Sequence, residues 1–173
     1  GLATRGITRT FAIQELTLPI ALSGQDLIGQ ARTGMGKTYG FGVPLLDRVF
    51  DDADIEELDG TPRALVVVPT RELAQQVTKD LQVAAADIPV RLVSIYGGRP
   101  YEEQITKLNK GADVIIGTPG RLIDLHERGN LQLDRVAILV LDEADEMLDL
   151  GFLPSVEAIL QALDGNAHQT MLF

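Results

Sequence analysis

The sequence has no cysteine and no tryptophan, and aromatic residues make up only 5% of its 173 positions. The lack of cysteine excludes disulfide bonds and thiolate-bound metal sites, as is common in a reducing compartment. No apolar run approaches the roughly 20 residues that a membrane-spanning helix needs. The first residues also lack the basic segment followed by an apolar one that marks a secretory signal. We therefore expect a soluble, cytoplasmic protein.

Acidic residues outnumber basic ones by 25 to 15, which gives a formal net charge of −10. This balance disfavours a broad nucleic-acid-binding surface, because affinity for phosphate comes from lysine and arginine. Any such surface must be local. Much of the acidic excess lies in residues 51–59, which we expect to form a solvated loop after a helix.

Short β-branched runs alternate with helical patterns, which predicts an α/β fold with a mostly parallel sheet and helices on both faces. The length accommodates one domain over residues 1–173, and an end within an apolar run suggests part of a longer protein. The expected strands are residues 26–29, 64–68, 90–95, 113–116, 136–141 and 170–173. The expected helices are residues 11–22, 37–50, 71–86, 101–108, 119–127 and 153–163, the first two kinked at Pro19 and Pro44.

A glycine-rich segment, Ala31-Arg-Thr-Gly-Met-Gly-Lys-Thr38, predicts a phosphate-binding loop. Backbone N–H groups at such a turn wrap phosphate oxygens, while Lys37 neutralises charge and Thr38 ligates Mg²⁺. The usual pattern G-x-x-x-x-G-K-[ST] starts with a glycine where this chain has Ala31, but the glycines nearest the phosphates are kept. The predicted nucleotide-binding residues are Arg32, Thr33, Gly34, Met35, Gly36, Lys37 and Thr38.

A pair of carboxylates, Asp142 and Glu143, follows the apolar run at residues 136–141. That run predicts a strand buried on both faces, and its carboxyl end is the edge where open α/β sheets bind ligands. Alone, the two acids are equally compatible with a solvated turn. Together with the phosphate-binding loop, they predict Asp142 as the Mg²⁺ partner and Glu143 as the group that orients and deprotonates an attacking water. The spacing of the motif assigns no role to Asp145.

Four other features have both a structural and a functional interpretation. Gln14 is a polar position on an amphipathic helix, and Gly97-Gly98 is a turn. Thr70 and Thr118 are good N-cap residues, and the free N–H groups at a helix start also suit a phosphate. The two histidines, His126 and His168, have no partner residues near them in sequence and are expected on the surface.

These segments resemble, in order and spacing, the first RecA-like domain of DEAD-box RNA helicases. The matching segments are Gln14, Ala31 to Thr38, Pro69-Thr-Arg-Glu-Leu-Ala74, Gly97-Gly98, Thr118-Pro-Gly-Arg121 and Asp142-Glu-Ala-Asp145, and they span nearly the whole chain. The resemblance implies a RecA-like three-layer sandwich that binds ATP, Mg²⁺ and RNA, with Gln14 reading the adenine edge. It further implies RNA-backbone contacts, without base readout, from Pro69, Thr70, Arg71, Gly97, Gly98, Thr118, Pro119, Gly120 and Arg121.

The chain departs from the family pattern before Gln14, where Thr10-Phe-Ala-Ile replaces the usual Pro-Thr-Pro-Ile. The upstream aromatic residue that stacks on adenine would fall before Gly1, so the resemblance does not establish whether adenine recognition is intact. The second RecA-like lobe, whose arginines are worth about 10³ to 10⁵ in rate in comparable enzymes, is absent. We therefore expect this chain to bind nucleotide weakly, to hydrolyse it barely and not to unwind RNA.

Three alternatives to an RNA helicase lobe stay open from the residues. A small-molecule kinase with a phosphate-binding loop would need an arginine-bearing lid and an acceptor pocket, and neither is visible in the sequence. A non-catalytic module would use nucleotide only to set the shape of an acidic docking surface. A DNA helicase of related fold is the alternative most similar to an RNA helicase, but Asp142-Glu-Ala-Asp145 and Gln14 favour RNA as the substrate.

Overall fold

The computed structural model describes residues 2–3, 6, 9–31, 36–51, 55 and 57–173. Within these residues the chain forms six strands and seven helices. The strands are β1 (Leu27–Ile28), β2 (Ala64–Val67), β3 (Leu92–Ile95), β4 (Val114–Gly117), β5 (Ile138–Leu141) and β6 (Gln169–Leu172). The helices are α1 (Ala12–Leu22), α2 (Lys37–Asp51), α3 (Arg71–Ala84), α4 (Tyr101–Asn109), α5 (Pro119–Glu127), α6 (Ala144–Asp149) and α7 (Leu153–Ala162).

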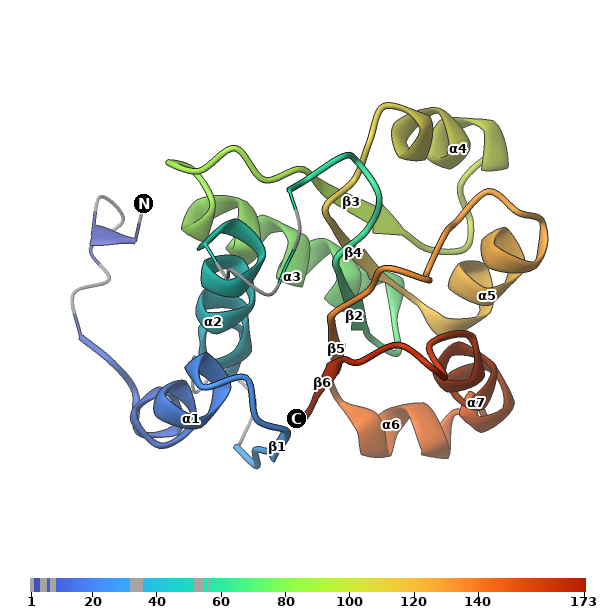
Figure 1. The fold of residues 1–173 in the computed structure, drawn as a ribbon. Helices are drawn as coiled ribbons and strands as arrows, with labels where there is room; N and C mark the ends of the chain where they lie inside the picture. Colours follow the sequence, from blue (N-terminus) through green and yellow to red (C-terminus); the bar gives the residue numbers. More distant parts are fainter. Residues whose placement is uncertain (1, 4–5, 7–8, 32–35, 52–54, 56) are drawn as a thin grey trace.

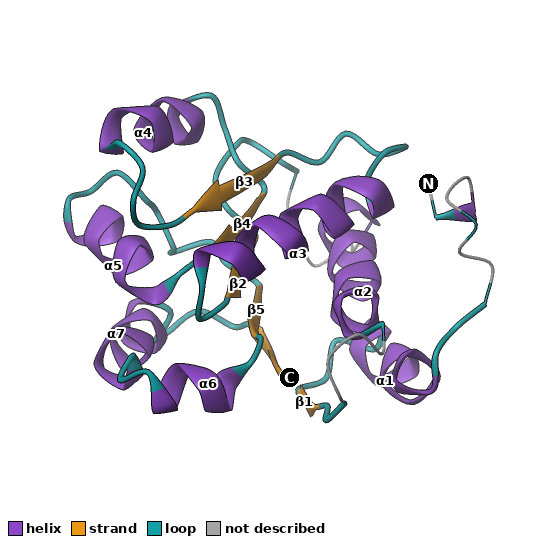
Figure 2. Ribbon diagram, turned by 180° about the vertical axis from the view of Figure 1, so that it is seen from behind, coloured by secondary structure: helices purple, strands orange, loops and turns teal. Residues whose placement is uncertain are grey.

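The strands form one parallel sheet in the order β1-β6-β5-β2-β4-β3. Helices α1 to α3 lie on one side of this sheet and α4 to α7 on the other, as Figures 1 and 2 show from opposite directions. The predicted α/β fold with helices on both faces is confirmed. Each predicted strand is present, and the ends of the predicted elements differ from the observed ones by two residues at most.

The central strands are buried on both faces, so alternate residues contribute to two separate cores. Val66 and Val140 pack with Phe41 of α2 and Val77 of α3 in one core. Their neighbours in β2 and β5, such as Leu65, pack with residues of α5, α6 and α7 in the other. This continuous burial is typical of a parallel sheet covered on both faces, and it explains why β2, β4 and β5 read as unbroken apolar runs.

One helix was not predicted, and one predicted loop is partly buried. Helix α6 has only six residues and follows directly after the Asp142-Glu143 pair, so its pattern is too short to show a helical period. The acidic segment at residues 51–59 begins inside α2, and Ile55 and Leu58 pack against the core next to α2. The solvated-loop prediction was therefore wrong for these two apolar side chains.

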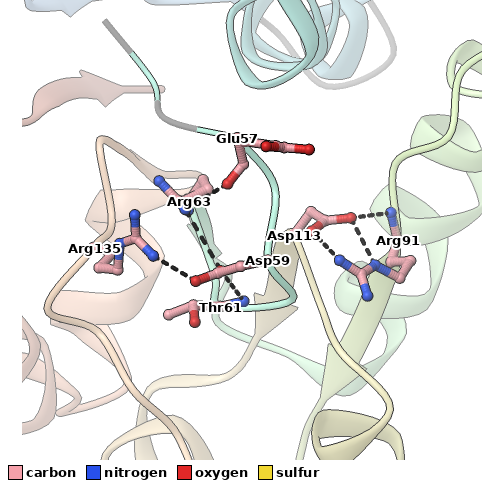
Figure 3. Close-up of polar contacts among 7 residues, drawn as sticks. All are labelled: Glu57, Asp59, Thr61, Arg63, Arg91, Asp113 and Arg135. Atoms are coloured by element: carbon pink, nitrogen blue, oxygen red, sulfur yellow. Dashed lines mark hydrogen bonds and ion pairs between the residues drawn. The ribbon is translucent and has the colours of Figure 1, made fainter.

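Two separate clusters of polar contacts, described together as the polar network, lie among the chain segments just before four of the strands (Figure 3). The buried carboxylate of Asp113 accepts hydrogen bonds from the Arg91 backbone N–H at 2.8 Å and from its Nε and Nη2 at 3.0 and 2.8 Å. Asp59 forms ion pairs with Arg63 and Arg135 and accepts a hydrogen bond from the Thr61 N–H. This network fixes the amino ends of the strands, opposite the edge that carries the predicted site.

No helix within the described residues is long and apolar enough to cross a membrane.

Candidate functional site

Strand β5 delivers Asp142 and Glu143 to the carboxyl edge of the sheet. The Asp142 N–H donates to the Val67 carbonyl at 2.9 Å, which continues the pairing with β2 and leaves the side chain only 1% exposed. Glu143 then turns the chain into α6 with φ 54° and ψ 48°, and it is the only residue other than glycine with a positive φ in the described chain. A left-handed glutamate is strained, and such strain concentrates at functional positions.

Gly36 is the described end of the predicted phosphate-binding loop, and α2 begins at the next residue. Its φ is +75°, and a Cβ there would lie 2.5 Å from both Gln14 Nε2 and Phe11 Cδ2. Backbone conformation and close packing therefore both require glycine at this position. The predicted nucleotide-binding residues Arg32, Thr33, Gly34 and Met35 lie outside the described residues.

Lys37 brings the two predicted segments together. Its Nζ lies 2.9 Å from Asp142 Oδ1 and 2.5 Å from Glu143 Oε1. The lysine side chain is 10% exposed and the glutamate side chain 25% exposed, so this ion triad is screened from water on most sides. The contact with Glu143 is a directed hydrogen bond, whereas the buried Asp142 Oδ1 has an ion pair without a hydrogen bond.

Burial and charge act in opposite directions on both members of the Lys37–Asp142 pair. For Lys37, burial lowers the pKa, but the hydrogen bond to Glu143 and the charge of Asp142 outweigh it, so the pKa lies above 10.5. For Asp142, burial raises the pKa above 3.8 although the positive charge of Lys37 opposes the shift. The site therefore holds a firmly protonated amine beside a carboxylate whose ionised form is costly to bury.

A cavity of about 410 Å³ opens beside the ion triad. Its lining includes Thr38, Lys37, Asp142 and Glu143, so the predicted metal ligands Thr38 and Asp142 share one space. A second cavity of about 490 Å³ is lined by Gln14, Thr10 and Arg9, and Tyr39 lines both cavities. The structure thus brings the described predicted nucleotide-binding residues to two cavities that share a wall.

Gln14 links α1 to the end of the phosphate-binding loop. Its side chain is buried, its Oε1 accepts a hydrogen bond from the Phe11 N–H at 3.0 Å, and its Nε2 donates to the Gly36 carbonyl at 2.8 Å. The sequence pattern predicts Gln14 on an amphipathic helix but does not reveal this contact, which joins residues 22 positions apart. It also did not single out Tyr39, although an aromatic residue directly after Thr38 was a visible signal.

The predicted RNA-binding segments follow β2, β3 and β4, which are neighbours in the sheet. Thr70 caps α3, because its Oγ1 accepts a hydrogen bond from the Leu73 N–H at 3.2 Å. Thr118 occupies the N-cap of α5 but makes no capping bond with its side chain. Gly98 has a φ of +80°, and a Cβ there would approach Arg71 Nη1 at 3.3 Å. Arg121 Nη1 donates to the Arg99 carbonyl at 2.9 Å.

These contacts place the segments ending in Arg71, Gly98 and Arg121 along one edge of the sheet, the same edge that carries the ion triad. Pro69 and Gly120 lie in the same connections. The two histidines lie elsewhere. His126 Nδ1 is 2.9 Å from the Leu131 carbonyl oxygen and His168 Nδ1 is 2.8 Å from the Asn166 carbonyl oxygen, so each ring nitrogen donates to a backbone acceptor. Among the described residues, no group of three or more histidine or acidic side chains is arranged to hold a metal ion alone.

Comparison with known proteins identifies the family. A model of the DEAD/DEAH box helicase family matches residues 11–173. DEAD-box ATP-dependent RNA helicase 53 of Oryza sativa subsp. japonica is 48% identical over 172 residues, which cover 99% of this chain and 28% of that protein. DEAD-box ATP-dependent RNA helicase 9, mitochondrial, of Arabidopsis thaliana is 46% identical and is covered to 27% of its length.

A solved structure shares the fold. The crystal structure of a DEAD box protein from Methanococcus jannaschii superposes with a TM-score of 0.88 at 36% identity, covering 99% of this chain and 45% of that one. The RecA-like fold expected from the resemblance is therefore confirmed. The family model, the two relatives and the solved structure all agree, and the chain belongs to the DEAD/DEAH box helicase family.

Proposed function

We propose that this chain is the ATP-binding lobe of an ATP-dependent RNA helicase. The observation that carries the proposal is the ion triad of Lys37, Asp142 and Glu143, which joins the phosphate-binding loop to the carboxylates after β5. The names of the relatives support it, although the chain spans only about a quarter of the length of those proteins.

ATP binding follows from the chemistry of the triad. A triphosphate competes with the carboxylates for the amine of Lys37, and a lysine amine is cationic at neutral pH beside either anion. Without nucleotide, Lys37 is the cation paired with Asp142 and Glu143. When Lys37 moves to a phosphate, both carboxylates lose this partner. Glu143 is then available to orient a water molecule and accept its proton.

The donor set fits Mg²⁺. This ion is commonly held by one or two carboxylates together with the phosphates of the substrate, rather than by a protein cage. Asp142 Oδ1 is buried without a hydrogen bond, and Thr38 lines the same cavity. Asp142 and Thr38 would hold the ion, which would neutralise charge on the phosphates.

Adenine recognition is proposed for Gln14. Both of its amide atoms are engaged in the structure, with the Phe11 N–H and the Gly36 carbonyl. Each amide atom keeps one more hydrogen-bonding position, because the nitrogen carries a second N–H and the oxygen a second lone pair, so Gln14 can contact a base edge while it keeps both bonds. Because one of these bonds holds the loop end at Gly36, a base held by Gln14 would lie next to the predicted phosphate-binding loop.

RNA binding is proposed for the segments after β2, β3 and β4. They contain Pro69, Thr70, Arg71, Gly97, Gly98, Thr118, Pro119, Gly120 and Arg121. Two of them begin helices, α3 and α5, whose first N–H groups suit a phosphate, and Arg71 and Arg121 add positive charge. Contacts of this kind position a backbone without reading bases.

Three further parts of the proposal concern the protein beyond this site. We propose that residues 1–173 form one domain, that a second RecA-like lobe completes the catalytic site, and that this chain alone is nearly inactive. A cytoplasmic location remains a prediction from composition, since one relative is named as mitochondrial.

The test compares phosphate release by this chain and by the full-length protein that contains it, each with Glu143 and with Glu143→Gln. We expect RNA-stimulated release only from the full-length protein, and the substitution should abolish it while ATP binding persists. Robust RNA-stimulated release from this chain alone would refute the need for a second lobe. Undiminished turnover in the Glu143→Gln protein would refute the assigned role of Glu143, and binding without any turnover would favour a non-catalytic module.

A further inference from the structure

Tyr101, the first residue of α4, lies against two arginines of the α5 segment. The Arg121 Cζ is 4.0 Å from the centroid of the Tyr101 ring, and the Arg128 Cζ is 4.3 Å from it. Both distances lie within the roughly 6 Å at which a guanidinium is attracted to an aromatic face. One ring therefore holds two cations in a chain that is otherwise strongly acidic.

The ring is fixed at both of its ends. The Tyr101 side chain packs against the core that contains Leu122 and Leu125, and its hydroxyl donates a hydrogen bond to Asp124. Asp124 also accepts a hydrogen bond from Arg128 Nε at 2.9 Å. The hydrogen bond from Tyr101, and then the one from Arg128, hold the pKa of the Asp124 carboxyl below its usual value, so this anchor is ionised at neutral pH.

The guanidinium of Arg121 is restrained on a second side. Its Nη1 donates to the Arg99 carbonyl, directly after the Gly97-Gly98 turn. This bond uses one of the five N–H donors of the group and leaves the others for a phosphate. Arg121 is thus held between the Tyr101 ring and the loop after β3, at the edge proposed for RNA.

We propose that Tyr101 is a positioning residue that holds the Arg121 guanidinium in place for an RNA phosphate. The inference rests on the proposed function, because it needs RNA to bind at Arg121. An arginine side chain loses rotamer freedom when it binds, and a side chain ordered beforehand avoids that loss. From the strength of exposed cation–π contacts, removal of the ring should weaken RNA binding by about two- to fivefold.

The test is a double-mutant cycle on this chain, with Tyr101→Leu, Arg121→Ala and both substitutions together. The probe is a fluorescein-labelled single-stranded oligouridylate, and its anisotropy gives the affinity at low salt. We expect Tyr101→Leu to weaken binding in the unaltered background and to have no further effect once Arg121 is alanine. Tyr101→Phe, which keeps the ring, should retain most of the affinity.

Two control measurements separate positioning from a general loss of structure. The Tyr101→Leu chain should remain folded, with a cooperative urea transition, and its affinity for ATP with Mg²⁺ should change little. In NMR spectra, the Arg121 side-chain protons should carry an upfield ring-current shift that persists in Tyr101→Phe and disappears in Tyr101→Leu.

Each outcome decides one of the two proposals. If the unaltered chain binds no oligouridylate, the RNA-binding part of the proposed function fails, and this inference fails with it. If RNA binds and Arg121→Ala weakens it but Tyr101→Leu does not, only the inference is overturned. Equal losses from Tyr101→Leu with and without Arg121 would also overturn it, because Tyr101 would then act independently of the arginine.

Discussion

At the scale of single residues, the burial of Asp142 has a consequence for stability. Burial raises the pKa of its carboxyl above 3.8, so the folded chain binds that proton more tightly than the unfolded chain does. The ionised carboxylate therefore lowers the free energy of unfolding. This loss is absent below the unfolded pKa and develops as the pH rises through the folded-state pKa.

We predict that Asp142→Asn raises the free energy of unfolding, and that the gain is larger at pH 8 than at pH 3, which lies below the ordinary aspartate pKa of 3.8. The pKa of Lys37 lies above 10.5, so its contribution does not change over this interval, and Glu143 remains as its partner in the variant. Urea unfolding at the two pH values measures the effect. A variant less stable than the unaltered chain at pH 8 would contradict it.

Glu143 is the second residue with a measurable consequence, because its backbone is left-handed. Such a conformation costs residues with a Cβ about 1 to 2 kcal/mol and costs glycine almost nothing. We predict that Glu143→Gly is more stable than Glu143→Ala by about 1 kcal/mol, the reverse of the usual order in helices. The two variants remove the same carboxylate, so their difference in urea unfolding isolates the backbone. Equal stability would contradict a strained Glu143.

At the scale of elements, the two threonine N-caps provide a matched pair. Thr70 accepts a hydrogen bond from the Leu73 N–H, whereas the side chain of Thr118 makes no capping bond. We predict that Thr70→Ala lowers the free energy of unfolding by about 1 kcal/mol and that Thr118→Ala lowers it by clearly less. If the two substitutions have the same effect in urea unfolding, the capping bond at Thr70 contributes nothing.

The elements also differ in how well their sequence predicts them. Strands β2, β4 and β5 are continuous apolar runs, and α5 begins with Pro119 directly after the N-cap Thr118, so their positions could be predicted closely. Helix α6 could not, because six residues are less than two helical turns.

The sequence indicates which residues belong to the candidate site, but it does not indicate most of the contacts that their side chains make. The spacing of glycines, Lys37 and the carboxylates predicted that the two segments meet, and their ion pairs agree with this. The bond from Gln14 to the Gly36 carbonyl and the stacking on Tyr101 depend on which elements become neighbours. Local periodicity does not contain that information.

At the scale of the whole molecule, the two edges of the sheet differ: the amino ends of the strands carry structural contacts and the carboxyl ends carry the candidate site. The carboxyl ends carry the ion triad and the segments proposed for RNA. The amino ends are joined by the polar network of Figure 3, in which the fully buried Asp113 is paired with Arg91. We expect this network to support the sheet without contacting ligands.

We predict that Arg91→Leu lowers the free energy of unfolding by about 2 to 3 kcal/mol, because it leaves a buried carboxylate without its side-chain donors. Arg135→Leu is the matched control, since its partner Asp59 is 48% exposed and such pairs are worth less than about 1 kcal/mol. Urea unfolding of both variants tests the difference. Nucleotide affinity should be the same in both, and a selective loss in Arg91→Leu would contradict a purely structural network.

Whether Lys37 and Asp142 share one nucleotide is tested by a calorimetric titration of ATP into this chain and into its Lys37→Ala variant, each with Mg²⁺ and with a chelator. We predict that ATP binds better with Mg²⁺, and that the variant loses at least about tenfold in affinity, as expected when a charged hydrogen bond is removed. Equal affinities in the two chains, or binding indifferent to Mg²⁺, would show that Lys37 and Asp142 do not share a nucleotide.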